Sequence, residues 1–430
     1  MELIKSQKGT QDLLPKDTEK WQAVENVMRD EAKLHGFGEI RTPVFEDTKL
    51  FQRSVGETTD VVQKEMYTFD DKGGRSITLR PEGTAGAVRA VLQHGLFNDA
   101  LPIKLYYAIT CYRYENTQAG RQREFHQFGL EMLGASSPIA DAEIIGIAKS
   151  IFDRLGIKNL SLEINSIGCP ECRAKYHDAL KEYFAKYKDK LCETCLGRLS
   201  RNPMRILDCK SPICSEISEN APRMLDYLCE DCKNHFESVK TYLDAAEIKY
   251  TVNPSIVRGL DYYTNTVFEF ISNDLGAQST VCGGGRYNGL VEEMGGKPMP
   301  ALGFALGMER LMMIMEAQKI EFPKPETCDI FIGTLGEKAK VEAFRLTNML
   351  QKYSIFAVCD VNDRGLKAQM KYADKIGAKY TIVLGDNELE TKKAMIKNMK
   401  TGEKSKISLG EKFVEDFVIL QTENQDDIKF

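Results

Sequence analysis

Arginines and acidic residues recur at short spacing in residues 111–133, whose sequence is CYRYENTQAGRQREFHQFGLEML. Arg113 precedes a polar loop that adds Arg121 and Arg123, and the run after the loop carries Glu131. A guanidinium group binds phosphate or carboxylate as a fork, and a carboxylate suits a cationic or N–H ligand. These residues could hold both ends of a zwitterionic or nucleotide substrate. An Arg-rich hairpin turn exposed to water would have the same composition.

Two strands would have to position this loop. Residues 104–110 are β-branched and aromatic, and residues 125–132 alternate in character with a period of two. Successive side chains of a strand point to opposite faces, so one face of the second strand would be the floor of a site and the other would join the core. The floor would consist of Phe125, Gln127, Gly129 and Glu131, and the core face of His126, Phe128, Leu130 and Met132.

A second set of residues that could carry chemistry is a group of paired cysteines. Eight of the 12 cysteines lie between residues 169 and 232, in Cys-x2-Cys and Cys-x4-Cys spacings that suit tetrahedral coordination of zinc. Up to two four-cysteine metal sites are predicted, with His235 as a reserve ligand. An iron–sulfur cluster, or unliganded thiols in a strongly reducing cell, would fit the same residues. The candidate zinc ligands are Cys169, Cys172, Cys192, Cys195, Cys209, Cys214, Cys229 and Cys232.

Length, charge and composition limit the function classes. A chain of 430 residues with 42% hydrophobic content can bury a large core and should form two or three domains. The net charge of -5 disfavours a nonspecific nucleic-acid binder. The polar N-terminus resembles neither a signal peptide nor a membrane span. We therefore expect a cytoplasmic protein without a membrane partner, whose cysteines are reduced or metal-bound.

The arginine-rich segment resembles a known motif. Arg113, Tyr114 and Glu115, followed by GRQREFHQ at residues 120–127, resemble motif 2 of class II aminoacyl-tRNA synthetases, in the form found in histidyl-tRNA synthetases. Arg310 matches the arginine of class II motif 3. The segment RGLDYY within residues 256–270 is similar to the first histidine-specific signature of that family.

The glycine-rich segment GGGRYNGL, which ends residues 281–290, is similar to the second such signature. The two signatures argue against the prolyl, threonyl and glycyl enzymes, which share a similar C-terminal domain. A zinc-dependent nucleic-acid binder built on the cysteines alone would leave most of the chain unexplained. The resemblance covers essentially the whole chain outside the cysteine-rich part.

The resemblance implies an α+β catalytic domain of the class II synthetase type, residues 1–325, built on an antiparallel sheet of six or more strands. The sheet domain would be interrupted by the cysteine insert, residues 168–240. A linker at residues 321–327 would lead to an α/β domain at residues 328–430, which binds the anticodon arm in this family. Alternating apolar strands and helices independently predict a mostly parallel sheet in that last domain.

The resemblance also implies a role for each candidate site residue. Glu82 and Gln127 would take the substrate ammonium, while Glu131 and Tyr263 would hydrogen-bond the two imidazole nitrogens. The expected histidine-binding residues are Glu82, Gly83, Thr84, Arg113, Gln127, Glu131, Arg258, Tyr262 and Tyr263. The expected ATP-binding residues are Arg113, Glu115, Arg121 and Arg310, and the expected catalytic residues are Arg113, Arg258 and Arg310.

The activity implied is that of a histidine–tRNA ligase. Such an enzyme activates L-histidine with ATP and Mg²⁺ to histidyl-adenylate, transfers it to the 3′ end of tRNA(His), and releases AMP and pyrophosphate. Motif 1, which forms the homodimer interface in the family, corresponds to residues 36–60. The alternative is a catalytically silent synthetase-like subunit that regulates histidine biosynthesis. Such subunits typically lose the catalytic arginines, whereas Arg113, Arg258 and Arg310 are present here.

This sequence departs from the family at two places. Asn116 and Thr117 stand where Arg-Pro is usual, in the motif 2 loop that meets the acceptor stem in this family. Asn265 stands at a turn where glycine is usual, and we expect little effect from it. Two local predictions concern the N-terminal region: a helix capped by Asp17 or Thr18, and a short edge strand that contains Pro43.

Overall fold

The computed structural model divides into two compact units, Met1–Pro323 and Lys324–Phe430, which are described separately. The structure describes residues 3–56, 59–207, 209, 211–256, 258–274, 280–323 and 326–423. Residues 324 and 325 of the predicted linker, residue 257 of the first histidine-specific segment and residues 424–430 of the predicted last domain lie outside that description.

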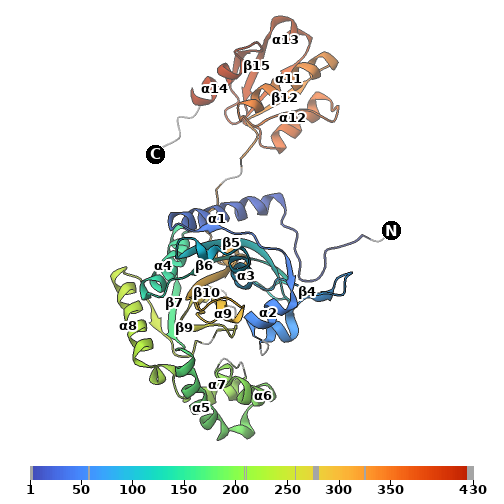
Figure 1. Cartoon of the computed structure of the whole chain (residues 1–430). Coiled ribbons are helices and arrows are strands. Elements are labelled where there is room, and N and C mark those ends of the chain that lie inside the picture. The colour runs from blue at the N-terminus through green and yellow to red at the C-terminus, as the bar shows by residue number, and fades with distance from the viewer. Residues whose placement is uncertain are drawn as a thin grey trace. The chain divides into compact units, whose positions relative to one another are not determined.

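An eight-stranded sheet organises the first unit (Figure 1). All neighbouring strands are antiparallel except the two edge pairs, β1 with β5 and β7 with β8. The predicted antiparallel sheet of six or more strands is confirmed. In spatial order its strands are β1 (Gly38–Glu39), β5 (Ile103–Tyr112), β6 (Glu124–Leu133), β11 (Ala301–Gly307), β10 (Thr280–Arg286), β9 (Thr264–Ser272), β7 (Leu160–Ser166) and β8 (Thr251–Val252).

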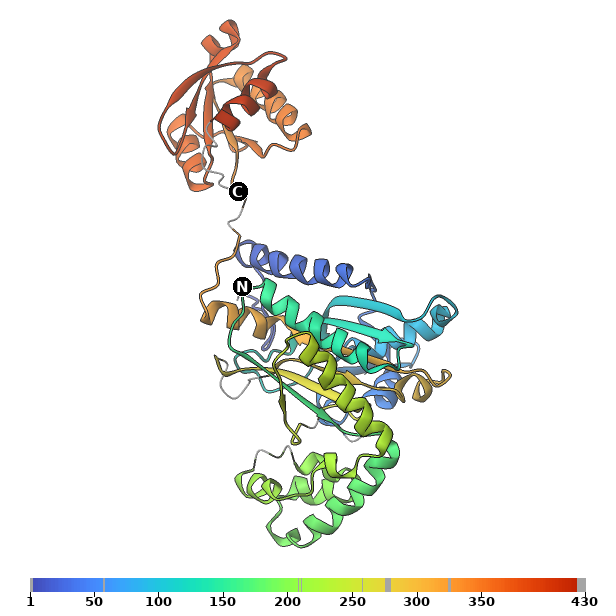
Figure 2. The ribbon, with the colours of Figure 1, turned by 90° about the vertical axis from the view of Figure 1, so that its left-hand side faces the viewer.

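Four helices cover one face of this sheet, and Figure 2 looks onto two of them, the teal α4 and the yellow-green α8. They are α1 (Pro15–Leu34), α4 (Pro138–Arg154), α8 (Glu230–Ala245) and α10 (Met308–Ala317). Phe128, Leu130 and Met132 of β6 are buried in the core between sheet and helices, as predicted. His126 on the same face is only partly buried and hydrogen-bonds Glu309 through Nδ1 at 2.9 Å. These four helices do not cover the opposite face of the sheet, which is the face predicted to carry the site.

The start of α1 differs from the prediction. The helix begins at Pro15, Leu14 occupies the N-cap position, and no side chain caps the helix. Proline is favoured at the first helical position because its fixed φ suits the helix and it has no N–H group to leave unpaired. Asp17 and Thr18 lie inside the first turn, so the predicted side-chain cap is wrong.

A small three-stranded sheet follows, in the order β2 (Phe45–Asp47), β4 (Ser76–Leu79) and β3 (Thr68–Asp70). Pro43 lies between β1 and β2 rather than in a strand, so the predicted Pro43 strand is wrong. Proline has no N–H for a strand ladder. Instead, the carbonyls of Thr42 and Pro43 accept hydrogen bonds from Arg80 Nη1 at 2.8 and 3.3 Å. Other helical segments of this unit are α2 (Thr48–Val55), η1 (Val61–Glu65), α3 (Thr84–His94), η2 (Leu96–Asn98) and α9 (Leu290–Glu293).

The cysteine insert is helical, and its α5, α6 and α7 form a lobe below the sheet in Figure 1. Its helical segments are α5 (Pro170–Ala185), η3 (Lys188–Lys190), α6 (Glu193–Arg201), η4 (Pro203–Ile206), α7 (Pro212–Glu219), η5 (Met224–Tyr227) and the first part of α8. One hydrophobic cluster runs from Tyr176 and Leu180 of α5 to Tyr262, Tyr263 and Tyr287. The lobe therefore shares its core with the segments that resemble the histidine-specific signatures.

The second unit is an α/β domain with one five-stranded sheet. The strand order is β13 (Ala357–Cys359), β12 (Ile330–Thr334), β14 (Tyr380–Leu384), β15 (Lys393–Asn398) and β16 (Lys404–Ser408). The helices are α11 (Glu337–Lys352), α12 (Leu366–Lys375), α13 (Asp386–Thr391) and α14 (Phe413–Glu423). The three predicted strands are mutually parallel, but β15 and β16 add antiparallel pairs. The sheet is therefore mixed rather than mostly parallel. A short turn joins β15 to β16 and permits only antiparallel pairing there, and β15 also runs antiparallel to β14.

Candidate active site

A cavity of about 280 Å³ opens on the sheet face that carries Phe125 and Gln127. Of the residues expected to bind histidine or ATP, all except Gly83 and Glu131 line this cavity. These lining residues are Glu82, Thr84, Arg113, Glu115, Arg121, Gln127, Arg258, Tyr262, Tyr263 and Arg310. Arg123, whose guanidinium lies over the Tyr114 ring, and Gly129 of the predicted floor are not among the lining residues. Gly83 and Glu131 contact the lining from outside it, through hydrogen bonds to Gln127 and Thr84.

Glu82 is held at the start of α3. Its two carboxylate oxygens accept hydrogen bonds from the backbone N–H groups of Thr84 and Ala85, both at 2.8 Å. These N–H groups belong to the first helical turn and have no partner within the helix. Burial raises the pKa of Glu82, and the hydrogen bonds from Ala85 and Thr84, together with the Arg113 cation, oppose that shift. The carboxylate is thus fixed in place at one end of the cavity, with capacity for a further donor.

Gly83 makes room for an aromatic ring beneath the site. Its N–H donates to Gln127 Oε1 at 3.1 Å, which orients the amide of Gln127. A Cβ atom at Gly83 or at Gly129 would overlap the ring of Tyr107, so both positions require glycine. The Tyr107 ring therefore lies against the backbone of Gly83, at the start of α3, and of Gly129 in β6.

Glu131 is the centre of a buried hydroxyl network. Its carboxylate accepts hydrogen bonds from Thr84 Oγ1 at 2.7 Å, from the Tyr107 hydroxyl at 2.9 Å and from the Tyr287 hydroxyl. Only 1% of Glu131 is exposed, and burial raises its pKa to about 8 even though these hydroxyls favour the charged form. A Cβ at Gly303 would overlap this carboxylate. The network presents a polar, water-excluded surface to the cavity.

Arg258 lies across β9 and β10, paired with a carboxylate. Its Nη1 donates to Glu269 Oε1, and its guanidinium lies 5.5 Å from the centre of the Tyr263 ring. A Cβ at Gly283 would overlap the guanidinium, so this glycine lets the cation lie flat on the strand. Burial disfavours the Arg258 cation, but Glu269 beside it raises the pKa overall. Arg258 is charged at any physiological pH.

Arg113 and Arg121 share one carboxylate. Glu115 Oε1 lies 3.8 Å from Arg113 Nη1, and Glu115 Oε2 lies 3.3 Å from Arg121 Nη1. Arg113 is further fixed by a 2.8 Å hydrogen bond from Nε to the carbonyl of Pro81, and it stacks over the Phe125 ring at 5.3 Å. Two guanidinium groups are thereby directed to the same wall of the cavity.

Arg310 connects β10 to the loop that lies between β5 and β6. Its Nη1 donates to the carbonyl of Thr280 at 2.7 Å and its Nε to the carbonyl of Gly120 at 3.3 Å. Burial lowers the pKa of Arg310, and the nearby Arg121 cation lowers it further. An anion placed among these arginines would relieve that repulsion.

Two chemically different ends therefore meet in one cavity. Four arginines (Arg113, Arg121, Arg258 and Arg310) can bind a polyanion. The phenols of Tyr262 and Tyr263, whose ring centres are 4.7 Å apart, adjoin the Glu131 network and can bind a polar ring. The arrangement suits charge neutralisation and positioning, since it provides cations where a phosphate would react and hydrogen-bonding groups for a second substrate.

Three residues of this site were not predicted: Tyr107, Tyr287 and Glu269. Each belongs to a segment with a predicted role. Tyr107 lies in residues 104–110, Tyr287 in GGGRYNGL and Glu269 in residues 256–270. Period-two alternation would have placed Tyr107 on one strand face, but pairing it with Glu131 requires the register of β5 against β6.

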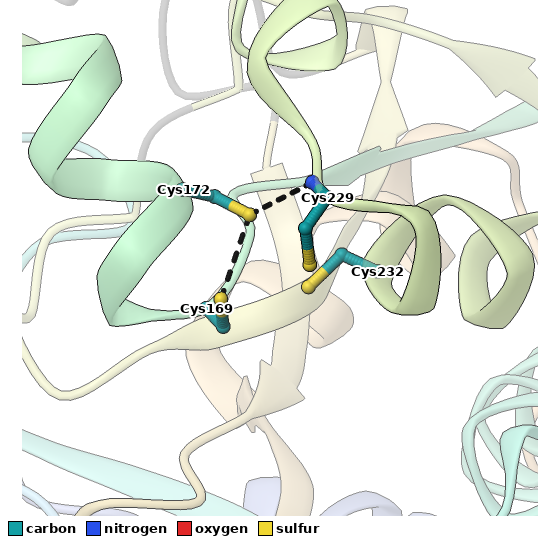
Figure 3. Close-up of side chains that lie close together, drawn as sticks. All are labelled: Cys169, Cys172, Cys229 and Cys232. Atoms are coloured by element: carbon teal, nitrogen blue, oxygen red, sulfur yellow. Dashed lines mark hydrogen bonds between the residues drawn. The ribbon is translucent and has the colours of Figure 1, made fainter.

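Among the described residues, the groups that could hold a metal ion are two cysteine clusters. The root cluster consists of Cys169, Cys172, Cys229 and Cys232 (Figure 3) and the outer cluster of Cys192, Cys195, Cys209 and Cys214. In each cluster the four sulfurs lie within 4.8 Å of one another. His235 belongs to neither cluster, because its Nε2 hydrogen-bonds Asp141 Oδ2 at 3.1 Å.

Sequence and structure comparisons place this architecture among known proteins. The family model described as "Histidyl-tRNA synthetase" matches residues 9–311, and that described as "Anticodon binding domain" matches residues 329–415. The apo crystal structure of histidyl-tRNA synthetase from S. aureus superposes with a TM-score of 0.83 at 43% identity, covering 96% of this chain and 100% of that one.

Curated relatives agree over nearly the full length. The histidine–tRNA ligase of Clostridium novyi (strain NT) is 57% identical over 406 residues, which is 94% of this chain and 97% of the relative. The histidine–tRNA ligase of Acetivibrio thermocellus is 57% identical over 407 residues, 95% of this chain and 98% of the relative. In the described part of the chain, no helix has the length and apolar character needed to cross a membrane.

Proposed function

The chain belongs to the histidyl-tRNA synthetase family and has histidine–tRNA ligase activity, and we propose that the cavity described above is where it forms histidyl-adenylate. Its substrates are histidine, ATP and tRNA. In the first step a carboxylate oxygen of histidine attacks the α-phosphorus of ATP, and the bond from that phosphorus to pyrophosphate breaks. In the second step a ribose hydroxyl at the 3′ end of the tRNA attacks the acyl carbon, and AMP leaves.

The observation that carries this proposal is the convergence of Arg113, Arg258 and Arg310, from three separate motif segments, on one cavity. Negative charge grows at the α-phosphate during the first step, and fixed cations stabilise such charge without reorganising. Arg113 and Arg258 are each held by further contacts, to Pro81 and to Glu269. The chemistry needs no side-chain nucleophile, because the substrate carboxylate attacks.

Arg113, Arg121, Glu115 and Arg310 form the proposed ATP site. Glu115 pairs with Arg113 and Arg121 and so keeps both guanidinium groups on one wall. Arg310 adds a third cation beside the motif 2 loop, where it would hold the adenine and γ-phosphate end of ATP. Mg²⁺ bound to ATP would neutralise phosphate charge there.

Histidine selection is proposed to rest on Glu131 and Tyr263, which would hydrogen-bond the two imidazole nitrogens. An ionised carboxylate, the form that Glu131 takes above its pKa of about 8, offers about four acceptor positions. Three hydroxyls already donate to Glu131, from Thr84, Tyr107 and Tyr287, so one position is left for an imidazole N–H. A ring lacking that N–H would leave a buried carboxylate underbonded, and such a mismatch costs ~10⁴-fold in discrimination.

The ammonium group of histidine is proposed to bind Glu82 and Gln127. Both side chains are already oriented by backbone N–H groups, Glu82 by Thr84 and Ala85 and Gln127 by Gly83. Preoriented acceptors lose little conformational entropy when the ligand arrives. Tyr262 would line the pocket beside them.

The second unit is proposed to bind the anticodon arm of tRNA(His), supported by its match to the anticodon-binding family. We further propose a homodimer formed through the motif 1 region, residues 36–60, and a cytoplasmic enzyme. The rival reading, a regulatory subunit without catalysis, is disfavoured because Arg113, Arg258 and Arg310 are all in the cavity.

The test is histidine-dependent exchange of pyrophosphate into ATP, with proline, threonine and glycine as parallel substrates. We expect exchange with histidine alone and its loss in Arg258→Ala. Charging of a tRNA(His) transcript, but not of a transcript with an altered anticodon, would support the role of the second unit. Histidine binding without exchange would overturn the proposal in favour of the regulatory subunit.

A further inference from the structure

The two cysteine clusters have the dimensions of metal sites. Four sulfurs placed 2.3 Å from a central zinc in a tetrahedron lie about 3.8 Å apart. The Sγ atoms of Cys169 and Cys172 are 3.5 Å apart in the root cluster, and those of Cys192 and Cys209 are 3.8 Å apart in the outer cluster. All eight cysteines are free of disulfides. Both clusters therefore enclose a space that a tetrahedral ion fits.

The surrounding backbone favours thiolates. Cys169, Cys192 and Cys229 stand at the N-cap positions of α5, α6 and α8, and their Cys-x2-Cys partners lie in the first turn of each helix. The positive end of a helix dipole stabilises a thiolate. Backbone N–H groups also donate to sulfur, from Cys229 to Cys172 at 3.0 Å (Figure 3) and from Cys192 to Cys214 at 3.3 Å.

From this geometry we propose that the cysteine insert binds two zinc ions, one in each cluster, each held by four thiolates. Tetrahedral all-sulfur coordination without an open position is typical of structural zinc. The root ion would fasten the start of α5 to the start of α8, and the outer ion would fasten α6 to the segment before and at the start of α7. The two ions would thus tie α5, α6, α7 and α8 to one another at their N-termini.

The insert also contacts the segment proposed to bind histidine, so the ions would brace that segment. This step rests on the proposed function. Arg173 of α5 donates to the carbonyl of Tyr263 at 3.1 Å. Arg205, between the two halves of the outer cluster, donates to the carbonyl of Gly259 at 2.6 Å, and Asn202 donates to Asp261 at 3.2 Å.

Asn265 links the root cluster to β9 directly. Its side-chain amide donates to Cys232 Sγ at 3.3 Å, and its backbone pairs with Gly168 and Ile167. Its φ of 50° is in the left-handed region, which explains why glycine is usual there and why asparagine is tolerated. The departure from the family is therefore a contact to a proposed zinc ligand, two residues after Tyr263.

The first test is metal and sulfide analysis of the purified full-length protein. We expect two equivalents of zinc per chain, one equivalent in the double variant Cys192→Ser/Cys195→Ser, and two in the control Cys359→Ser, whose cysteine lies in the second unit. Iron with acid-labile sulfide would replace the zinc assignment by an iron–sulfur one. A wild-type protein with no bound metal and eight reactive thiols would overturn the proposal, whether or not the variants fold.

The second test is Asn265→Gly, which keeps the left-handed backbone but removes the amide. Loss of an outer hydrogen bond to a metal ligand commonly weakens metal binding ~10–100-fold. We expect one of the two zinc ions to be lost to a chelator about that much faster, and the KM for histidine to rise several-fold with the KM for ATP unchanged. Faster zinc loss with unchanged kinetics would overturn the bracing role but not the metal sites. Because zinc is measured directly, an inactive enzyme would still test the sites.

Discussion

The catalytic cavity and the cysteine insert are held in shape by different means. Around the cavity, residues from β5, β6, β9, β10 and β11 are fixed by strand register and by buried hydrogen bonds such as those to Glu131. The insert contains helices and no described strand, and its sulfurs gather at helix N-termini. The cavity draws its order from a sheet, whereas the insert has an apolar core and would be tied further by the zinc ions proposed for its clusters.

This difference shows how side chains are placed accurately in each of the two regions. A sheet places side chains by a period of two and a fixed register, so a cavity built on it can be accurate without any ligand. Helices of eight or nine residues, such as α7 and α6, are marginal by themselves. They need external ties, which the two proposed zinc sites would supply. Damage to one region should therefore leave the structure of the other region largely unchanged.

The largest effect is expected from the sheet side, at the buried pair of Arg286 and Asp141. Arg286 is 1% exposed, forks onto Asp141 at 2.6 to 2.9 Å, and also donates to the carbonyls of Ala135 and Ser137. Arg286→Met leaves a buried carboxylate, which costs ~3–5 kcal/mol. Urea unfolding should show that loss, while zinc per folded chain stays the same.

The control for this prediction is Arg286→Met/Asp141→Leu, which removes both charges and should recover part of the loss. His235, the other partner of Asp141, should then lose its hydrogen bond as well. A loss below ~1 kcal/mol in the single variant would show that the buried pair does not support the sheet.

The next effect is on rate alone. Arg258→Ala should lower the pyrophosphate-exchange kcat by ~10²–10³-fold, by analogy with loss of one donor aimed at developing charge. The insert should keep its metal, because Arg258 has no contact with either cluster among the contacts described above. Arg29→Ala, which removes a half-buried helical ion pair with Glu25 on α1, is the matched control and should change kcat less than twofold. Equal losses in both would contradict the assigned role.

How much of this could be read from the sequence differs between the two regions. The motif resemblance predicted that Arg113, Arg258 and Arg310 serve one site, and the structure brings them together. It did not reveal Tyr287 on Glu131, because that contact depends on how β10 pairs with β11 and where Gly303 leaves space. Which side chains face each other on neighbouring strands depends on the strand register, and a single sequence does not reveal that register.

For the insert, spacing predicted metal-binding potential but not the grouping. The first and last pairs meet in one cluster and the two middle pairs in the other, which follows from how α5 and α8 approach each other. Likewise β15 and β16 were missed because their charged and apolar residues alternate over only a few positions. Asn265 was expected to matter little, since the cluster beside it was not foreseeable from a turn.

Removing the metal should affect the insert more than the cavity. Treatment with a strong chelator under reducing conditions should raise the rate of proteolytic cleavage within residues 168–240 by ~10-fold or more, since metal binding is coupled to folding. Cleavage in the eight-stranded sheet should change little. Returning zinc should restore protection, and magnesium, the control ion, should not. Cleavage that is insensitive to chelation would mean that the lobe is ordered by its apolar core alone.

The smallest expected effect is a pH dependence of the free energy of unfolding that arises from the cavity only. Burial raises the pKa of Glu131 to about 8, from 4.5 when exposed. Between these values the folded protein keeps a proton that the unfolded chain has lost, so the free energy of unfolding falls as pH rises through this window. Between pH 6 and 8.5 the wild type should lose at least about 1 kcal/mol more than Glu131→Gln.

The control for the pH prediction is Glu316→Gln, an exposed position on α10, which should follow the wild type. The window starts at pH 6 because thiolate ligands take up protons in acid, and metal loss from the insert would then add its own pH dependence. Zinc content should therefore stay constant across the window. If Glu131→Gln loses as much stability as the wild type, the carboxylate is already ionised in the folded protein, and the three hydroxyls outweigh its burial.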